Sequence, residues 1–288
     1  MGPKRTEPTT NNYCLTLSYD GSAYHGWQYQ PDKISIQQTL EEAIAEIVQE
    51  KVHVTASGRT DAGVHAMGQV ANVRLATRLD ERTLCKAINA KLPLDIRIQS
   101  VRIAVMDFNA IRHAQRKRYR YVLQDGDHGN VFARNYCWYL PKRLDLSAMQ
   151  QAAALIQGEH DFACFQTAGS PRKSTVRTVY AADVRRVSLE LWNPIYIEVE
   201  ANGFLYNMMR NIVGTLVKVG QGREPVSWVR DVIADRDRRR AGCAAPARGL
   251  YLCCVEYPTS VFLSPAASPY DDSDGCDRLE GQTNENGL

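Results

Sequence analysis

The 288-residue chain lacks the features of several protein classes. No apolar run approaches the roughly 18 residues that a membrane-spanning helix needs. The polar N-terminal stretch MGPKRTEPTTNN has no apolar segment of the kind that secretory signals contain. We therefore expect a cytoplasmic protein with no membrane association.

Metal-binding and nucleotide-binding fingerprints are also missing. The eight cysteines form no C-x-x-C pair, and neither H-E-x-x-H, G-x-G-x-x-G nor a Walker lysine motif occurs. The spacing of His25, Asp61 and His65 matches no known metal-ligand pattern. The sequence thus predicts no metal and no nucleotide cofactor.

Charge is distributed unevenly along the chain. The net charge is +3, but the segment from Thr259 onward holds six acids and one base, which is −5 and leaves +8 for the rest. A positive body with clustered bases favours an anionic partner such as nucleic acid. A merely soluble basic surface is the alternative.

Strand and helix patterns alternate between two polar ends. Residues 1–11 and the acidic segment 259–288 lack periodicity and are expected to be disordered tails. Residues 12–105 follow the β-α-β-β-α-β order of a ferredoxin-like fold, within an N-terminal half at 12–110 that contains a glycine-rich loop. Residues 111–258 form a C-terminal α+β half. We expect an α+β protein whose two ferredoxin-like halves, with mostly antiparallel sheet, pack around a central basic cleft.

Several helix starts are marked by capping residues. Ser35, Asp80 and Asp145 each precede an apolar stripe of helical period. A further helix is predicted over 203–220, where Arg210 lies among apolar residues. Because arginine is rarely buried without a partner, it either reaches the surface or pairs with an acid from elsewhere in the chain.

The segment TASGRTDAGVHAMGQV places Asp61 between Gly58 and Gly63. Glycines allow a sharp turn and a close approach to a ligand. Taken alone, the segment favours a turn aspartate that bonds its own backbone. If Arg59 and a second arginine lie near, the ionised carboxylate is favoured and can act as a nucleophile or base. For His65, a structural or RNA-facing role is favoured over metal binding or base catalysis.

The segment RHAQRKRYRY interleaves bases with tyrosines. Bases hold phosphates, and aromatic rings stack on unpaired nucleobases. A solvated strand edge with core tyrosines is the alternative. Strand alternation puts Tyr119 and Tyr121 on one face and Arg118 and Arg120 on the other. The candidate RNA contacts are Arg112, Arg116, Lys117 and Arg118.

Six stretches together resemble the TruA family of tRNA pseudouridine synthases, in family order and over about residues 13 to 258. They are YDGSAYHGWQYQ (19–30), GRTDAGVHAMGQV (58–70), KRYRY (117–121), HDF (160–162), GFLYNMMRNIVG (203–214) and GLYLCCVEYP (249–258). The second and fifth stretches are highly specific.

The resemblance implies an isomerase that converts uridine to pseudouridine at positions 38, 39 and 40 of the tRNA anticodon arm. It implies a homodimer that needs neither cofactor nor metal. The family's catalytic aspartate falls on Asp61, and its base-stacking tyrosine on Tyr119. Arg59 is the motif arginine that precedes the aspartate, and Arg210 is the arginine that pairs with it.

One motif departs from the family pattern. Where members commonly read F-H-A-R, this chain has Phe108-Asn109-Ala110-Ile111, and the arginine comes one place later, as Arg112. The difference concerns a phosphate or sugar contact rather than the chemistry.

Two other functions are alternatives. A non-catalytic ferredoxin-like RNA-binding protein is the main rival, although the K/R-G-F/Y-G/A-F-V-x-F/Y signature of such modules is absent. A metal hydrolase that uses Asp20, Asp61 and His65 is the second.

Overall fold

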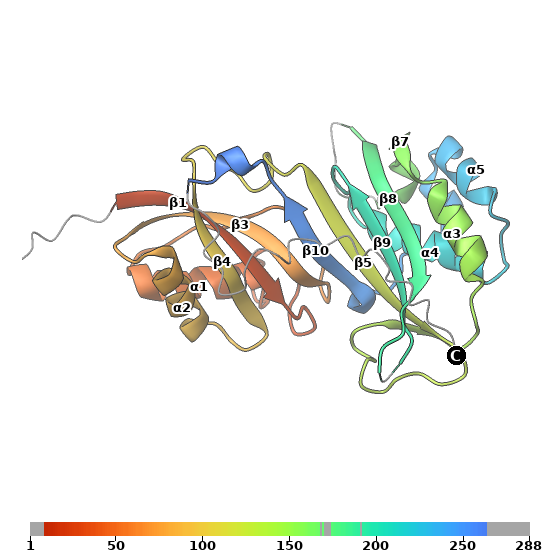
Figure 1. Ribbon diagram of the computed structural model, residues 1–288, viewed down its shortest axis with the longest axis horizontal. Helices are drawn as coiled ribbons and strands as arrows, with labels where there is room; N and C mark the ends of the chain where they lie inside the picture. Colours follow the sequence, from red (N-terminus) through yellow and green to blue (C-terminus); the bar gives the residue numbers. More distant parts are fainter. Residues whose placement is uncertain (1–8, 168, 170–173, 191, 264–288) are drawn as a thin grey trace, which may run out of the picture.

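The computed structural model describes residues 9–167, 169, 174–190 and 192–263. A ten-stranded sheet runs through the whole protein (Figure 1). Strand β1 begins at Thr9, inside the predicted N-terminal tail, and Thr259–Val261 form a 3-10 helix inside the predicted acidic tail. Val261 and Phe262 pack beside Phe108 because they are apolar. The rest of both predicted tails lies outside the described residues.

The N-terminal half has the predicted order of elements. It comprises β1 (Thr9–Tyr19), α1 (Ile36–Val48), β2 (Thr55–Ala56), β3 (His65–Thr77), α2 (Glu81–Lys91) and β4 (Ile96–Ala104). Strand β1 lies between β4 and β3 and is antiparallel to both, while β2 pairs with β3. This is a ferredoxin-like arrangement, as predicted.

The C-terminal half repeats that arrangement. It comprises β5 (Arg116–Asp125), β6 (Trp138–Leu140), α3 (Leu146–Ala154), β7 (Gly158–Asp161), β8 (Val176–Arg186), β9 (Ile195–Ala201), α4 (Met208–Gly220), α5 (Trp228–Asp235) and β10 (Leu250–Glu256). Its strands lie in the order β10-β5-β9-β8-β7. Elements β5, α3, β8, β9, α4 and β10 therefore match β1 to β4 with their helices, and the predicted pair of ferredoxin-like halves is confirmed.

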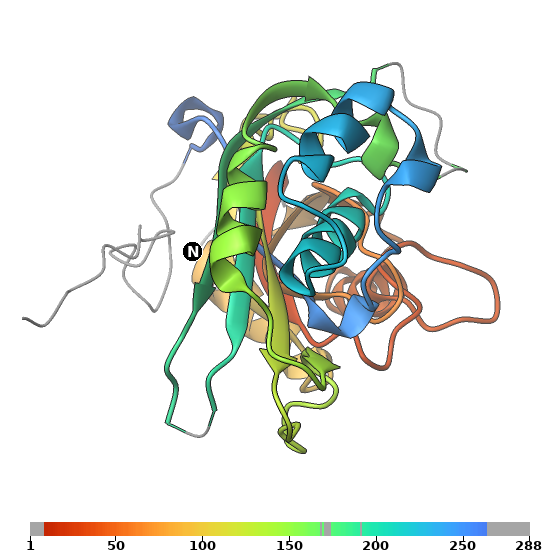
Figure 2. The same cartoon turned by 90° about the vertical axis from the view of Figure 1, so that its right-hand side faces the viewer.

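The two halves share one sheet because β10 pairs in parallel with β3. The register places Tyr251 opposite His65 and Leu252 opposite Ala66. Leu252 is also opposite Tyr119 of β5, and all of these except Tyr251 are buried. Figure 2 shows α1 and α4 on the same side of this sheet. Apolar side chains from both halves thus form one core beneath the helices.

Side-chain caps fix three of the helices where the sequence predicts them. The side-chain oxygens of Ser35, Asp80 and Asp145 accept hydrogen bonds from backbone amides three residues later, at 3.3, 2.7 and 2.9 Å. The helix predicted over 203–220 begins only at Met208. Asn207 adopts a left-handed conformation (φ 60°), which asparagine tolerates better than most residues and which interrupts a helix.

Candidate active site

Asp61 lies in the turn that joins β2 to β3. The turn is closed by a hydrogen bond from the Val64 amide to the Asp61 carbonyl at 3.1 Å, and Gly63 has a φ of +77°. Within the described chain, the Asp61 carboxylate accepts a hydrogen bond from Arg210 and none from its own backbone. The backbone of Asp61 therefore forms part of the turn, while its carboxylate is hydrogen-bonded to Arg210 and not to the turn.

The loop that follows β1 packs against this turn and is hydrogen-bonded to it. The Trp27 amide donates to the Thr60 carbonyl at 2.9 Å, and the hydroxyls of Tyr19 and Thr60 are 2.8 Å apart. A Cβ atom on Gly26 would lie 2.5 Å from the Thr60 carbonyl oxygen, so only glycine permits this contact. The motif YDGSAYHGWQ thereby acquires a role that the sequence did not assign: it positions the residue before Asp61.

Arg210 reaches Asp61 from the first turn of α4. Its Nη1 is 3.3 Å from Asp61 Oδ2 and also donates to Asn207 Oδ1 at 3.0 Å, while its Nε donates to the Ala245 carbonyl at 2.7 Å. The side chains of Arg210 and Asp61 are 20% and 31% exposed, so both can meet a ligand. The pair joins the two halves, and Asn207 and Ala245 are supports that the sequence did not reveal.

The side chain of Tyr119, on β5, lies on the same side of the sheet as Asp61 and Arg210. Its ring meets Phe204 edge to face, with 4.7 Å between centroids. Burial raises the pKa of the Tyr119 hydroxyl above its usual range, and electrostatic interactions with Tyr19 and Asp61 raise it further. The hydroxyl is therefore protonated at neutral pH and lies within the electrostatic influence of Asp61.

Comparisons with known proteins identify the family of the chain. A family model described as tRNA pseudouridine synthase covers residues 16–110 and 152–258. The chain belongs to this family. A "tRNA pseudouridine synthase A" of Thermoanaerobacter sp. (strain X514) is 41% identical over 85% of this chain and 99% of its own. Another of the same name from Chloroflexus aurantiacus is 44% identical over 86% of this chain and 89% of its own.

Two basic residues, Lys117 and Arg59, differ in their contacts with the turn that carries Asp61. Lys117 of β5 donates from Nζ to the Ser57 carbonyl at 2.5 Å, so it touches the turn directly. Arg59 is exposed and makes no hydrogen bond or ion pair among the described residues. Lys117 therefore contacts the segment that carries Asp61 from another strand, whereas Arg59 belongs to that segment and its side chain is exposed.

Arg116 and Arg118 lie on the opposite face of the sheet from Tyr119, as strand alternation predicts. Both bind Glu200 of β9, with N–O distances of 2.9 and 2.8 Å. Arg112 is exposed and lines a separate pocket of about 350 Å³ with Lys51 and Arg74. Of the four predicted RNA contacts, only Lys117 therefore adjoins the Asp61 turn.

The side chain of His65 points away from Asp61, although His65 follows Asp61 by only four residues in the sequence. It is 2% exposed, and its Nδ1 lies 3.1 Å from Asp20 Oδ1. In the part of the chain that the structure describes, no group of three or more His, Cys, Asp or Glu residues is placed to hold a metal ion. None of the described helices is both long and apolar enough to cross a membrane.

Proposed function

We propose that this chain isomerises uridine to pseudouridine at positions 38, 39 and 40 of the tRNA anticodon arm. We further propose that it acts as a cytoplasmic homodimer without cofactor or metal, and that Asp61 is the catalytic carboxylate. The observation that carries the proposal is the Asp61–Arg210 contact at 3.3 Å, because it brings together the most specific motifs of the two halves. Family membership supports the same reaction.

The reaction needs a carboxylate and a nucleobase held beside it, but no oxidant or reductant. The uracil leaves its stack, the bond from C1′ to N1 breaks, and a bond from C1′ to C5 forms. The proton on C5 is then lost and N1 gains one, so atoms and electrons balance. Asp61 can start this by attack at C1′, by attack on the ring, or by removing a proton from the sugar. In each case Arg210 orients the carboxylate, and Tyr119 packs on the base.

We also propose a division of labour between the halves. Residues 12–110 supply the turn with Asp61 and Arg59, and residues 111–258 supply Tyr119 and Arg210. Neither half alone holds the complete candidate site. The two halves therefore act as one catalytic unit.

The direct test is to incubate the protein with an unmodified tRNA and map pseudouridine chemically at each position. Conversion confined to positions 38, 39 and 40 is expected. Conversion elsewhere in the tRNA would contradict the site assignment. Tight binding without any conversion would favour the rival, a non-catalytic RNA-binding protein.

Replacing Tyr119 tests the stacking role. Tyr119→Phe keeps the ring and its contact with Phe204, whereas Tyr119→Leu removes the aromatic face. Stacking of a base on an aromatic ring contributes about 1–3 kcal/mol. The Leu variant should therefore lose roughly 10- to 100-fold in kcat/KM, and the Phe variant far less. Equal losses in both variants would show that the hydroxyl, and not the ring face, is what matters.

The basic residues should differ in their contribution to tRNA binding. We propose that Arg112 and Lys117 contact phosphates, and that Arg116 and Arg118 contribute less because Glu200 already binds both. In a plot of log affinity against log salt, Arg112→Gln should reduce the slope by about one. Arg118→Gln is the matched substitution and should change it less. A larger effect for Arg118 would reverse this order.

A further inference from the structure

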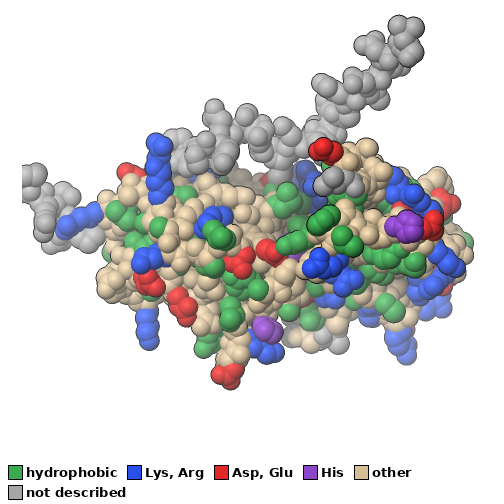
Figure 3. All heavy atoms as spheres, turned by 90° about the horizontal axis from the view of Figure 1, so that it is seen from below, with side chains coloured by type: hydrophobic (Ala, Val, Ile, Leu, Met, Phe, Trp, Pro, Cys, Tyr) green, Lys and Arg blue, Asp and Glu red, His purple; other side chains and the backbone are tan. Residues whose placement is uncertain are grey.

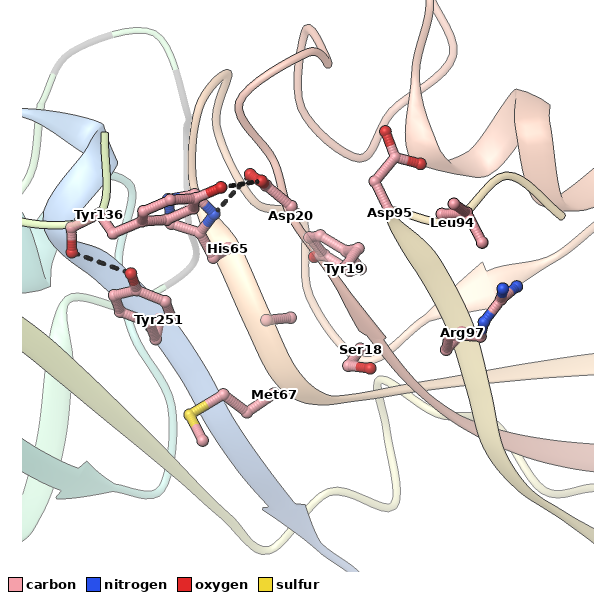
Figure 4. A pocket seen from close by; sticks show the side chains of 11 residues that line it. Ser18, Tyr19, Asp20, His65, Met67, Leu94, Asp95, Arg97, Tyr136 and Tyr251 are labelled. Carbon is pink, nitrogen blue, oxygen red and sulfur yellow. Dashed lines mark hydrogen bonds and ion pairs between the residues drawn. The ribbon is translucent and has the colours of Figure 1, made fainter. Parts of the chain in front are cut away.

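His65 links the two halves on the side of the sheet away from Asp61. It lies at the start of β3 beside a pocket of about 310 Å³ (Figure 4). The Gly21 amide donates a hydrogen bond to Nδ1 of His65 at 3.1 Å. Asp20 Oδ1 lies equally near, 3.1 Å from Nδ1, so this nitrogen faces a backbone donor and a carboxylate acceptor at once. At the other edge of the ring, Nε2 lies 3.2 Å from the Arg248 carbonyl, which accepts a hydrogen bond when Nε2 carries a proton.

The segment that contains Arg248 also contacts Arg210. Ala245, three residues before Arg248, accepts from Arg210 Nε at 2.7 Å and donates its own amide to the Arg210 carbonyl at 3.0 Å. Residues 245–248 thus contact Arg210 at one end and His65 at the other. His65 is in turn joined to Asp61 through the four-residue stretch that forms the turn.

We propose that His65 is a positioning residue for the isomerisation. Its ring, which contacts Gly21 in one half and Arg248 in the other, sets the spacing between Asp61 and Arg210. The inference rests on the proposed function, because it assigns a purpose to that spacing. His65 itself is turned away from the reacting atoms and acts only through the Asp61–Arg210 pair.

The surroundings of the ring hold it in one orientation. Tyr251 of β10 stacks on it, with 4.8 Å between centroids, and Tyr136 is tilted against it at 5.5 Å. The Tyr136 hydroxyl donates to Asp20 Oδ2 at 2.7 Å (Figure 4). Each contact comes from a different segment, so rotation of the ring would disturb all of them at once.

The arrangement depends on pH because a protonated ring can donate from Nδ1 to Asp20 but cannot accept from Gly21. The groups that face the ring are Asp20, Tyr136, Tyr251 and the carbonyls of Asn135 and Arg248. Burial lowers the pKa of His65 below its ordinary 6.5, and Asp20 opposes this. Protonation would replace the contact of Nδ1 with the Gly21 amide by an ion pair with Asp20 Oδ1, 3.1 Å away. We therefore expect the contact with Gly21, and with it kcat, to weaken as the pH falls below 6.5.

Two amide substitutions separate the two hydrogen bonds. In His65→Asn, the side-chain oxygen can replace Nδ1 toward Gly21 but does not reach Arg248. In His65→Gln, the longer side chain can donate to Arg248. Misplacement of about 1 Å at a reacting pair can cost about 10²-fold in rate. The Asn variant should therefore lose roughly that much in kcat with tRNA affinity unchanged, and the Gln variant should recover most of it.

Three further measurements make the test specific. When added to Arg210→Met, His65→Asn should cost much less than it does alone, because both changes act through one pair. The decrease in kcat at low pH that is caused by protonation of His65 should disappear in His65→Gln. His128→Asn, an exposed histidine in the loop before β6, is the control and should leave kcat unchanged.

The outcomes distinguish this inference from the proposed function. Equal kcat for the Asn and Gln variants, after correction for any difference in Tm, would overturn the positioning role. Full additivity with Arg210→Met would do the same. If the wild-type chain forms no pseudouridine in any tRNA, the proposed function fails, and this inference fails with it.

Discussion

Asp61→Asn should abolish pseudouridine formation and leave the fold and tRNA binding in place. Asparagine has the size of aspartate, and its side-chain oxygen can still accept the hydrogen bond from Arg210. It lacks the negative charge that attack at C1′, attack on the ring or removal of a sugar proton requires. We therefore expect the single-turnover rate to fall by about 10⁴-fold or more.

The control for this prediction is Asp127→Asn, which changes an exposed aspartate in the loop before β6. It should leave both the rate and the affinity unchanged. The affinity of Asp61→Asn for tRNA should stay within a few-fold of wild type, since one carboxylate adds little to a large phosphate-dominated interface. A rate near that of wild type in Asp61→Asn would remove Asp61 from the mechanism altogether.

Features that depend on neighbouring residues could be predicted from the sequence. The caps at Ser35, Asp80 and Asp145 depend on a side chain and an amide three residues later, so the pattern contains the whole interaction. The division of Tyr119 and Arg118 between two faces follows from the two-residue period of a strand. The fold class followed because these local elements occur in a recognisable order.

Features that depend on pairing between distant strands could not be predicted. That Arg116 and Arg118 both bind Glu200 follows from the register between β5 and β9, which the local sequence does not encode. The parallel pairing of β10 with β3 joins segments about 185 residues apart, and no local pattern encodes it. The position of His65 between Gly21 and Arg248 depends on that same pairing, which is why the sequence suggested only a structural or RNA-facing histidine.

Arg210→Met should impair turnover far more than tRNA binding. Methionine fills much of the same space but forms none of the hydrogen bonds that Arg210 makes to Asp61, Asn207 and Ala245. Asp61 would lose the group that orients it, while the phosphate contacts elsewhere would stay. We expect kcat to fall by roughly 10²- to 10³-fold, in the range seen when one oriented charged or polar group is removed from an active site, with the affinity for tRNA within a few-fold of wild type.

Arg210→Lys separates charge from geometry at the same position. Lysine keeps the positive charge, but its single ammonium cannot reproduce the planar set of donors that reaches three partners at once. If orientation is what Arg210 supplies, the Lys variant should be nearly as slow as the Met variant. If charge alone suffices, it should approach the wild-type rate. Arg223→Met, at an exposed position after α4, is the control and should be silent. A loss of tRNA affinity with unchanged kcat in Arg210→Met would instead make Arg210 a tRNA-binding residue and leave Asp61 without its partner.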